Sequence, residues 1–266
     1  LTVATAAGAP DVALTKQQLF MALAKQVPDK EGKLVDNPYK MWNEIDPSLP
    51  ATKIELLGPQ APDCLAAAGG QPDIAALARF QWREISLAGH SVTVVRLPGP
   101  GADAWRLLTP AVGWTEVRAA LTAAGARPIG QEAYNRLRVE AGMPAPGIEM
   151  TDAVTPLEAG LLAYISQTKG CYTGQEIIAR QLTYDKVTRH LCGLLLAQMV
   201  APGAALEVEG RSIGTVSSSV YSPALARPIA LAFVKRDYAT AGTAVMVRSG
   251  DETIEGQVVD LPFERP

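Results

Sequence analysis

The chain has 266 residues, of which 48% are apolar, and it carries a formal net charge of −3. This length and apolar content can bury a large core and predict two or three lobes, whereas the slightly acidic charge gives no electrostatic reason to expect binding to nucleic acid or to an anionic membrane. Three widely spaced cysteines without a C-x-x-C pair argue against a disulfide framework and against a self-contained zinc or iron–sulfur site, so we expect no metal ligands and a reducing, cytoplasmic compartment.

The amino-terminal part carries few clear signals. The chain opens on Leu1 and passes through small residues without the basic start and apolar core of a signal peptide, so we expect residues to precede it. Prolines, charges and turn formers predict loop over 28–50. The longest apolar stretch, 191–201, is shorter than the about 18 residues that span a bilayer, so we expect a water-soluble protein.

Short strands and helices alternate through the middle of the chain. The β-branched run at 91–97 predicts a strand, and the glycines and prolines at 98–101 form a turn that lacks the G-x-G-x-x-G spacing of a nucleotide loop. Thr115 is the expected N-cap of a helix over 116–124, which Gly125 ends.

A second helix is predicted over 131–141, ended by Gly142. Glu140 lies in its last turn, where the negative end of the helix dipole disfavours an unpaired carboxylate, so we expect a cationic or donor-rich partner. Arg136, four residues earlier, could supply a solvated ion pair. The spacing alone leaves that interpretation and a ligand-binding role both open.

The segment 169–176, KGCYTGQE, places one thiol between two glycines just before a predicted helix. Thr173 and Glu176 match a capping box. Because the helix N-terminus and Lys169 favour a negative charge, Cys171 is a candidate reactive thiol. The alternative is a small buried residue in a tight turn, since free cysteine is among the most buried residue types.

The carboxy-terminal part predicts a small antiparallel barrel. Turn residues at 209–210 and 249–251 read as hairpins between short β segments. Cys192, in the first of these segments, and Cys64, in an Ala-rich helix, are expected to be packed core thiols. The expected strands are 192–196, 205–208, 212–217, 228–234, 243–248 and 253–260.

Three motifs in order resemble one family. The string KGCYTGQE resembles the signature of the YgfZ family, folate-binding relatives of the glycine-cleavage T-protein, an aminomethyltransferase. Residues 136–144 resemble the "LR-x-E-A-G-x-P" segment of the wider superfamily, and 155–160 resemble its "P-x-E-A" continuation. Residues 53–59 resemble the "strand then G-P-x-A" element of its fold. The resemblance covers roughly residues 53–262.

The resemblance implies a fold and a cofactor. The implied fold is α+β and multi-lobed, with a folate-binding region of two lobes over 1–190 and the β-barrel over 191–266. Tetrahydrofolate is the implied cofactor, with Glu140 as the acceptor for the adjacent N–H and amino groups of the pterin ring. Further candidates for cofactor binding are Lys169, Tyr172, Arg180 and Arg189, of which Arg180 and Arg189, with Lys186, could instead form a solvated face.

The implied function is that of an accessory protein which supports iron–sulfur cluster assembly or repair through Cys171, with iron–sulfur proteins or assembly factors as partners. The alternative is a tetrahydrofolate-dependent aminomethyltransferase. Its "T-N-D" type segment is not visible here, since Asp36-Asn37 has the reverse order, so the interpretation favours a protein that is not an ordinary enzyme. A Cys171–His190 catalytic pair and an interaction module without a folate ligand stay open.

Overall fold

The structure is a computed structural model, and the residues that it describes form two compact units. The first unit comprises Leu1–Tyr134 and Tyr164–Gly170, and the second comprises Asn135–Ala163 and Cys171–Pro266. This division groups residues 135–163 and 171–190 with the barrel and so differs from a boundary at residue 190. The described residues are 2–5, 27–28, 34–35, 51–69, 72–100, 102–167, 170–172, 174–250 and 252–264.

The first unit contains a six-stranded sheet with the order β5-β6-β7-β4-β1-β8. All neighbours in it are antiparallel except β1 and β8, which are parallel. The strand expected at 91–97 is confirmed as part of the longer β6. The strands are β1 (Thr2–Thr5), β4 (Ala51–Leu57), β5 (Trp82–Leu87), β6 (His90–Gly99), β7 (Ala102–Pro110) and β8 (Arg127–Ile129), and a separate antiparallel pair is formed by β2 (Val27–Pro28) and β3 (Leu34–Val35).

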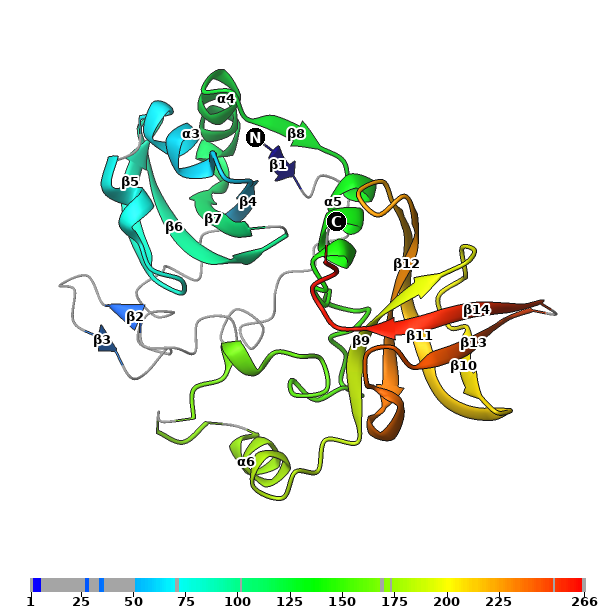
Figure 1. Cartoon of the computed structure of the whole chain (residues 1–266). Coiled ribbons are helices and arrows are strands. Elements are labelled where there is room, and N and C mark those ends of the chain that lie inside the picture. The colour runs from blue at the N-terminus through cyan, green and yellow to red at the C-terminus, as the bar shows by residue number, and fades with distance from the viewer. Residues whose placement is uncertain are drawn as a thin grey trace. The chain divides into compact units, whose positions relative to one another are not determined.

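Helices α3 and α4 pack on one face of this sheet (Figure 1). Alternation along β4 points Ile54 and Leu56 toward them, where they share a fully buried core with Leu65 of α3 and Leu121 of α4. Cys64 of α3 is buried in the same core, as predicted. The described helices are α3 (Ala61–Ala67), α4 (Trp114–Ala123), α5 (Gln131–Glu140) and α6 (Gln175–Thr183), and short 3-10 turns lie at Pro72–Ala76, Ala111–Gly113, Leu162–Tyr164 and Arg236–Tyr238.

The start of α4 differs from the prediction. Thr115 is not its N-cap, because the helix begins at Trp114 with Gly113 as the cap. The 3-10 turn over Ala111–Gly113 runs directly into the helix, so Thr115 already lies in the first turn. The predicted end is confirmed, since Gly125 has the left-handed φ of +99° that ends a helix.

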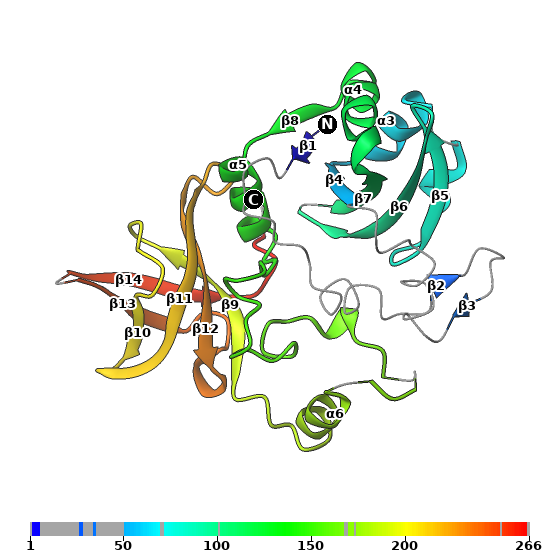
Figure 2. The ribbon, with the colours of Figure 1, turned by 180° about the vertical axis from the view of Figure 1, so that it is seen from behind.

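The second unit contains a closed antiparallel barrel with the order β10-β11-β12-β9-β14-β13. Each of the six predicted strands is found, and β9 and β12 lie side by side in both views (Figures 1 and 2). Glu209 and Gly210 both have positive φ, as the predicted two-residue hairpin requires. The strands are β9 (Arg189–Leu196), β10 (Ala205–Val208), β11 (Arg211–Ser222), β12 (Arg227–Lys235), β13 (Ala244–Ser249) and β14 (Glu252–Val259).

The barrel has an internal core and packs α5 against its wall. Leu194, Leu206 and Val247 are fully buried members of the internal cluster, to which Cys192 also belongs, as predicted. Val139 of α5 packs in a second cluster with residues of β12 and with the carboxy-terminal segment. This contact fixes the last turn of α5 on the barrel. Among the described residues, no helix combines the length and apolar character that crossing a membrane requires.

Candidate functional site

The last turn of α5 holds the carboxylate of Glu140 in a buried position. Glu140 is 8% exposed. Ser222, at the end of β11 and fully buried, donates a hydrogen bond of 2.6 Å from its Oγ to Glu140 Oε1. The same hydroxyl oxygen accepts the N–H of Leu225 at 3.2 Å. A donor brought by the barrel therefore orients this carboxylate, in agreement with the expectation of a compensating partner for Glu140.

Glycine at position 142 is required by both the helix end and the packing. The N–H of Gly142 donates to the carbonyl of Val139 and the N–H of Met143 to that of Arg138, which is the hydrogen-bond pattern of a Schellman cap. Gly142 has a φ of +67°, and a Cβ there would lie 2.7 Å from the side chain of Leu261. The predicted end of this helix is confirmed, and the tight contact keeps Glu140 next to the barrel.

A buried ion pair lies within the same motif, and sequence analysis did not predict it. Arg138 Nη1 donates to Glu149 Oε2 at 2.8 Å, and Arg138 Nη2 donates to Ser218 Oγ at 2.6 Å. Glu149 Oε1 accepts the hydroxyls of Ser217 and Ser218 at 2.8 and 2.6 Å. Arg138 is 3% exposed and Glu149 is inaccessible. The position of Arg138 in the family-like segment 136–144, with Glu149 five residues after it, was the available signal, but their pairing depends on folding.

The three cysteines have different environments. Cys171 is exposed, whereas Cys64 and Cys192 are buried. Burial raises the pKa of the Cys192 thiol to about 11 and also raises the pKa of Cys64 above its ordinary value. The interpretation of Cys171 as a small buried turn residue is therefore wrong. In the folded protein Cys171 is the accessible thiol.

The helix after the thiol starts one residue later than the capping box predicted. Its N-cap is Gly174, which has a left-handed φ of +87°, and no side chain caps the helix. A residue with a Cβ is strained in that conformation, which explains a glycine there. Thr173 and Lys169 lie outside the described residues, and the role of Lys169 as a positive charge beside the thiol stays a prediction.

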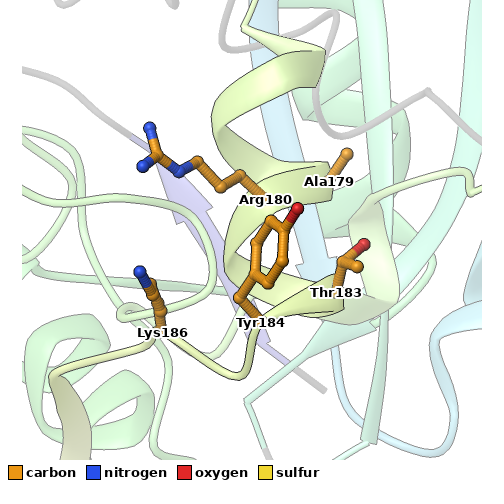
Figure 3. Close-up of a pocket in the computed structure, with 5 residues that line it drawn as sticks. All are labelled: Ala179, Arg180, Thr183, Tyr184 and Lys186. Atoms are coloured by element: carbon orange, nitrogen blue, oxygen red, sulfur yellow. The ribbon is translucent and has the colours of Figure 1, made fainter.

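Tyr172 lies three residues before the start of α6, and Arg180 lies in the last turn of this helix. Tyr172 is partly buried, which raises the pKa of its hydroxyl, and its carbonyl accepts the N–H of Gln175 at 3.1 Å. Arg180 is exposed and lines an open pocket of about 480 Å³ with Tyr184 and Lys186 (Figure 3). The remaining lining residues of this pocket are Ala179 and Thr183.

Arg189 begins β9 and is held by protein groups. Its Nε donates to Glu158 Oε1 at 3.0 Å and its Nη2 to the carbonyl of Ala153 at 2.6 Å. Its guanidinium also lies 5.2 Å from the centre of the Phe233 ring. Burial by itself would raise the pKa of Glu158, but the Thr155 N–H and the Arg189 guanidinium outweigh it and lower that pKa below its ordinary value.

The predicted site residues that the structure describes occupy three local environments in the second unit. Glu140 is bonded to β11 and Arg189 is bonded to Glu158, whereas Cys171 and Arg180 are exposed and Tyr172 is partly buried. Among the described residues, no three His, Cys, Asp or Glu side chains gather so that they could hold a metal ion.

Two family models together match most of the chain. Residues 14–169 match the GCVT N-terminal domain, and residues 189–264 match the glycine cleavage T-protein C-terminal barrel domain. The chain belongs to the glycine-cleavage T-protein family. The mixed helices and strands followed by a six-stranded antiparallel barrel are therefore the T-protein fold, as the sequence motifs predicted.

Individual T-protein relatives agree with this assignment. An aminomethyltransferase of Thermosynechococcus vestitus is 32% identical over 223 residues, which are 83% of this chain and 60% of the relative. A chloroplastic protein of Arabidopsis thaliana that carries the general name transferase is 34% identical over 177 residues, 66% of this chain and 37% of the relative. The crystal structure of the glycine cleavage system aminomethyltransferase T from Bartonella henselae superposes with a TM-score of 0.70 and 26% identity, covering 81% of this chain and 60% of that one.

The chain thus spans between about a third and three fifths of the length of these T-protein relatives. Membership in the family accounts for the fold of the described residues.

Proposed function

We propose that this T-protein-family chain is a tetrahydrofolate-binding accessory protein of the YgfZ type, which supports iron–sulfur cluster assembly or repair through Cys171. The observation that carries the proposal is the contrast among the cysteines: the thiol of the KGCYTGQE segment is exposed, while the other two are buried. An exposed thiol on a short loop can meet a group carried by another protein.

The residues around Glu140 suit a pterin. Its carboxylate is almost fully buried, and the Ser222 hydroxyl fixes one of its oxygens. A carboxylate has about four lone-pair sites and can accept a neighbouring N–H and amino group together, and charged hydrogen bonds of this kind are the stronger ones in proteins. When bound, tetrahydrofolate would bring a one-carbon carrier to the protein, and Glu140 would orient its pterin ring.

The other proposed folate contacts are secondary to Glu140. Arg189 would have to exchange its hydrogen bond to Glu158 for a carboxylate of the folate tail, whereas Arg180 could approach such a carboxylate directly. Tyr172 could offer its ring to the folate, and Lys169 keeps its predicted role as a positive charge beside the thiol.

Isothermal titration of tetrahydrofolate into the reduced wild type and into Glu140→Gln tests the folate part of the proposal. We expect binding by the wild type and a loss in the variant of about 1.5–3 kcal/mol for each charged hydrogen bond removed, which corresponds to about ten- to hundredfold weaker affinity. The matched control is Glu252→Gln, since Glu252 is an exposed glutamate on β14. A folded wild type that did not bind tetrahydrofolate would contradict the proposal.

The second candidate function is aminomethyl transfer to tetrahydrofolate, which the names of the aligned relatives favour. Such a reaction would need a general base near the reacting folate nitrogens. Tetrahydrofolate-dependent release of ammonia from an aminomethyl donor would identify it. Clear turnover would replace the accessory role by this enzymatic one, whereas folate binding without turnover, combined with loss of cluster-enzyme activity in cells carrying Cys171→Ser, would support the accessory role.

A further inference from the structure

The helix that follows the thiol loop presents apolar side chains to solvent. Ile178 is the buried residue of this helix, α6. Ile177 is 60% exposed, and Tyr184, which caps the carboxy-terminal end of the helix, is 64% exposed. These two residues are seven positions apart, two turns along one helix face, and Arg180 lies between them on that face. Ile177, Arg180 and Tyr184 therefore form a continuous exposed strip.

Two cations, Arg180 on this strip and Lys186 next to the Tyr184 ring, have no ion pair with another described residue. Lys186 Nζ lies 5.7 Å from the centre of the Tyr184 ring. Among the described residues, no carboxylate forms an ion pair with Arg180 or Lys186, although Glu176 lies one turn before Arg180 on the same helix. The open pocket of about 480 Å³ lies between Arg180, Lys186 and the Tyr184 ring (Figure 3).

The acidic residue next to Lys186 in the sequence already has a cationic partner. Asp185 forms an ion pair with Arg236, and Arg236 Nη1 donates to the Asp185 carbonyl at 2.7 Å. The Lys186 N–H donates to the carbonyl of Gln181 at 3.0 Å, which ties the following turn back to the helix. The carboxy-terminal end of α6 is therefore held by Arg236, which directly follows β12, and it carries the two positive charges of Arg180 and Lys186.

We propose that this strip docks an acidic segment, carrying at least one apolar side chain, of a protein that exchanges a group with Cys171. Charge complementarity selects the occupant, because the two cations need carboxylates while Ile177 and Tyr184 need an apolar contact. The nine residues of α6 span about 13 Å at 1.5 Å per residue. An extended segment of about six residues, at about 3.3–3.6 Å per residue, can thus lie along the whole helix. Cys171 comes three residues before the N-cap Gly174.

The inference rests on the proposed function of Cys171 and adds the means by which the partner is held there. Docking would raise the effective concentration of the partner's reactive group at the thiol without requiring a large interface.

Thiol exchange with an activated peptide tests the docking. The probe is a peptide of about eight residues, with alternating Glu and Leu, whose cysteine is blocked as a 2-pyridyl disulfide. The Cys171 thiolate attacks the peptide sulfur, a new disulfide joins the two cysteines, and pyridine-2-thiolate leaves and is measured by its absorbance. The comparison peptide has Gln in place of each Glu, and Cys171→Ser is the blank.

We expect the acidic peptide to react with the wild type about tenfold faster than the Gln peptide at low salt, and this ratio to fall toward one in about 1 M salt. The double variant Arg180→Glu/Lys186→Glu should lose the preference, and Ile177→Ser should reduce it. The matched control, Arg127→Glu/Arg211→Glu, makes the same change in net charge at two exposed arginines elsewhere in the chain and should keep it.

Equal rates for the two peptides with the wild type would overturn the proposal, as would a preference that survives in the double variant. A double variant that keeps the peptide preference but loses affinity for a γ-linked polyglutamyl tetrahydrofolate would overturn the docking and would leave Arg180 with the folate-tail contact proposed above.

The failure of the proposed function would look different. A small neutral disulfide, 2,2′-dithiodipyridine, reports the intrinsic accessibility of Cys171. If Cys171 did not react even with this reagent, the thiol role would fail. Fluorescence anisotropy with a labelled, cysteine-free acidic peptide would then decide the docking separately, with saturable binding that the double variant loses as the supporting result.

Discussion

The end of α5 and the surface of α6 belong to the same compact unit and carry charged side chains in opposite ways. Arg138 and Glu140 are 3% and 8% exposed and bonded to β11, whereas Arg180 is exposed at an open pocket. A buried and hydrogen-bonded carboxylate has one orientation, which suits the recognition of a small planar ligand. Arg180 and Cys171 are both exposed in this unit, which suits a partner that must arrive and leave. The end of α5 thus holds its carboxylate in one orientation, whereas the surface of α6 stays accessible to other molecules.

The largest effect is expected from breaking the buried ion pair. Glu149→Ala leaves the Arg138 guanidinium buried without its carboxylate, and such losses cost about 3–5 kcal/mol of stability. Urea unfolding monitored by circular dichroism measures the change. Ile177→Ala on α6 is the control and should stay within about 0.5 kcal/mol, because Ile177 is largely exposed. If both variants changed the free energy of unfolding by the same small amount, the buried ion pair would contribute no more to stability than the exposed surface of α6.

A smaller effect is expected from Ser222→Ala, which removes the donor to Glu140 Oε1. The net value of one hydrogen bond to a charged group is about 1.5–3 kcal/mol, and part of it should appear as weaker tetrahydrofolate affinity because the carboxylate is no longer oriented. Titration calorimetry and urea unfolding separate the two contributions. Ser212→Ala, at an exposed position of the same strand, serves as the control. Unchanged affinity in a stable Ser222→Ala protein would mean that Ser222 does not position Glu140.

The ion pair between Glu158 and Arg189 is less buried than the pair between Arg138 and Glu149 and more buried than Arg180. It predicts that the stability of the protein depends on pH. The pKa of Glu158 is lowered in the folded protein, despite burial, by the Thr155 N–H and by Arg189. The unfolded chain therefore binds a proton more readily, so this contribution to stability is present above the unfolded pKa of about 4.5 and is lost as the pH falls through the folded pKa.

Glu158→Gln should therefore flatten the dependence of the urea midpoint on pH below about pH 5, while the profile near pH 7 keeps its slope. Because Arg189 is partly exposed, the effect should be small and should shrink in high salt. If the urea midpoint of the variant depended on pH below about pH 5 as that of the wild type does, other groups would be responsible for this dependence.

The smallest effect on stability is expected at Cys171. Cys171→Ser replaces an exposed thiol and should change the free energy of unfolding by less than about 0.5 kcal/mol. The native wild type should react with one equivalent of a thiol reagent, and the two buried thiols should react only after unfolding. Destabilisation by several kcal/mol would show that the thiol is a packing group after all.

The strands of the barrel could be predicted well from the sequence. Alternating apolar residues and turn residues such as Glu209-Gly210 act within one strand or one hairpin, and each of the six predicted strands is present. Gly142 and Gly125 also mark helix ends correctly, since a left-handed backbone conformation is a local property. The N-caps of α4 and α6 were misplaced because the neighbouring turn geometry decides where a helix begins.

For the candidate site, the sequence by itself determined which chemical groups the chain contains: a thiol in KGCYTGQE, a glutamate in the last turn of a helix and the motifs of a T-protein-family fold. Only the tertiary structure decided that Cys171 is exposed, that Ser222 donates to Glu140 and that Arg138 pairs with Glu149. The physical reason is distance along the chain. Ser222 lies 82 positions after Glu140, so no local spacing rule brings the two together. Burial and pairing at such separations follow from the packing of α5 on the closed barrel.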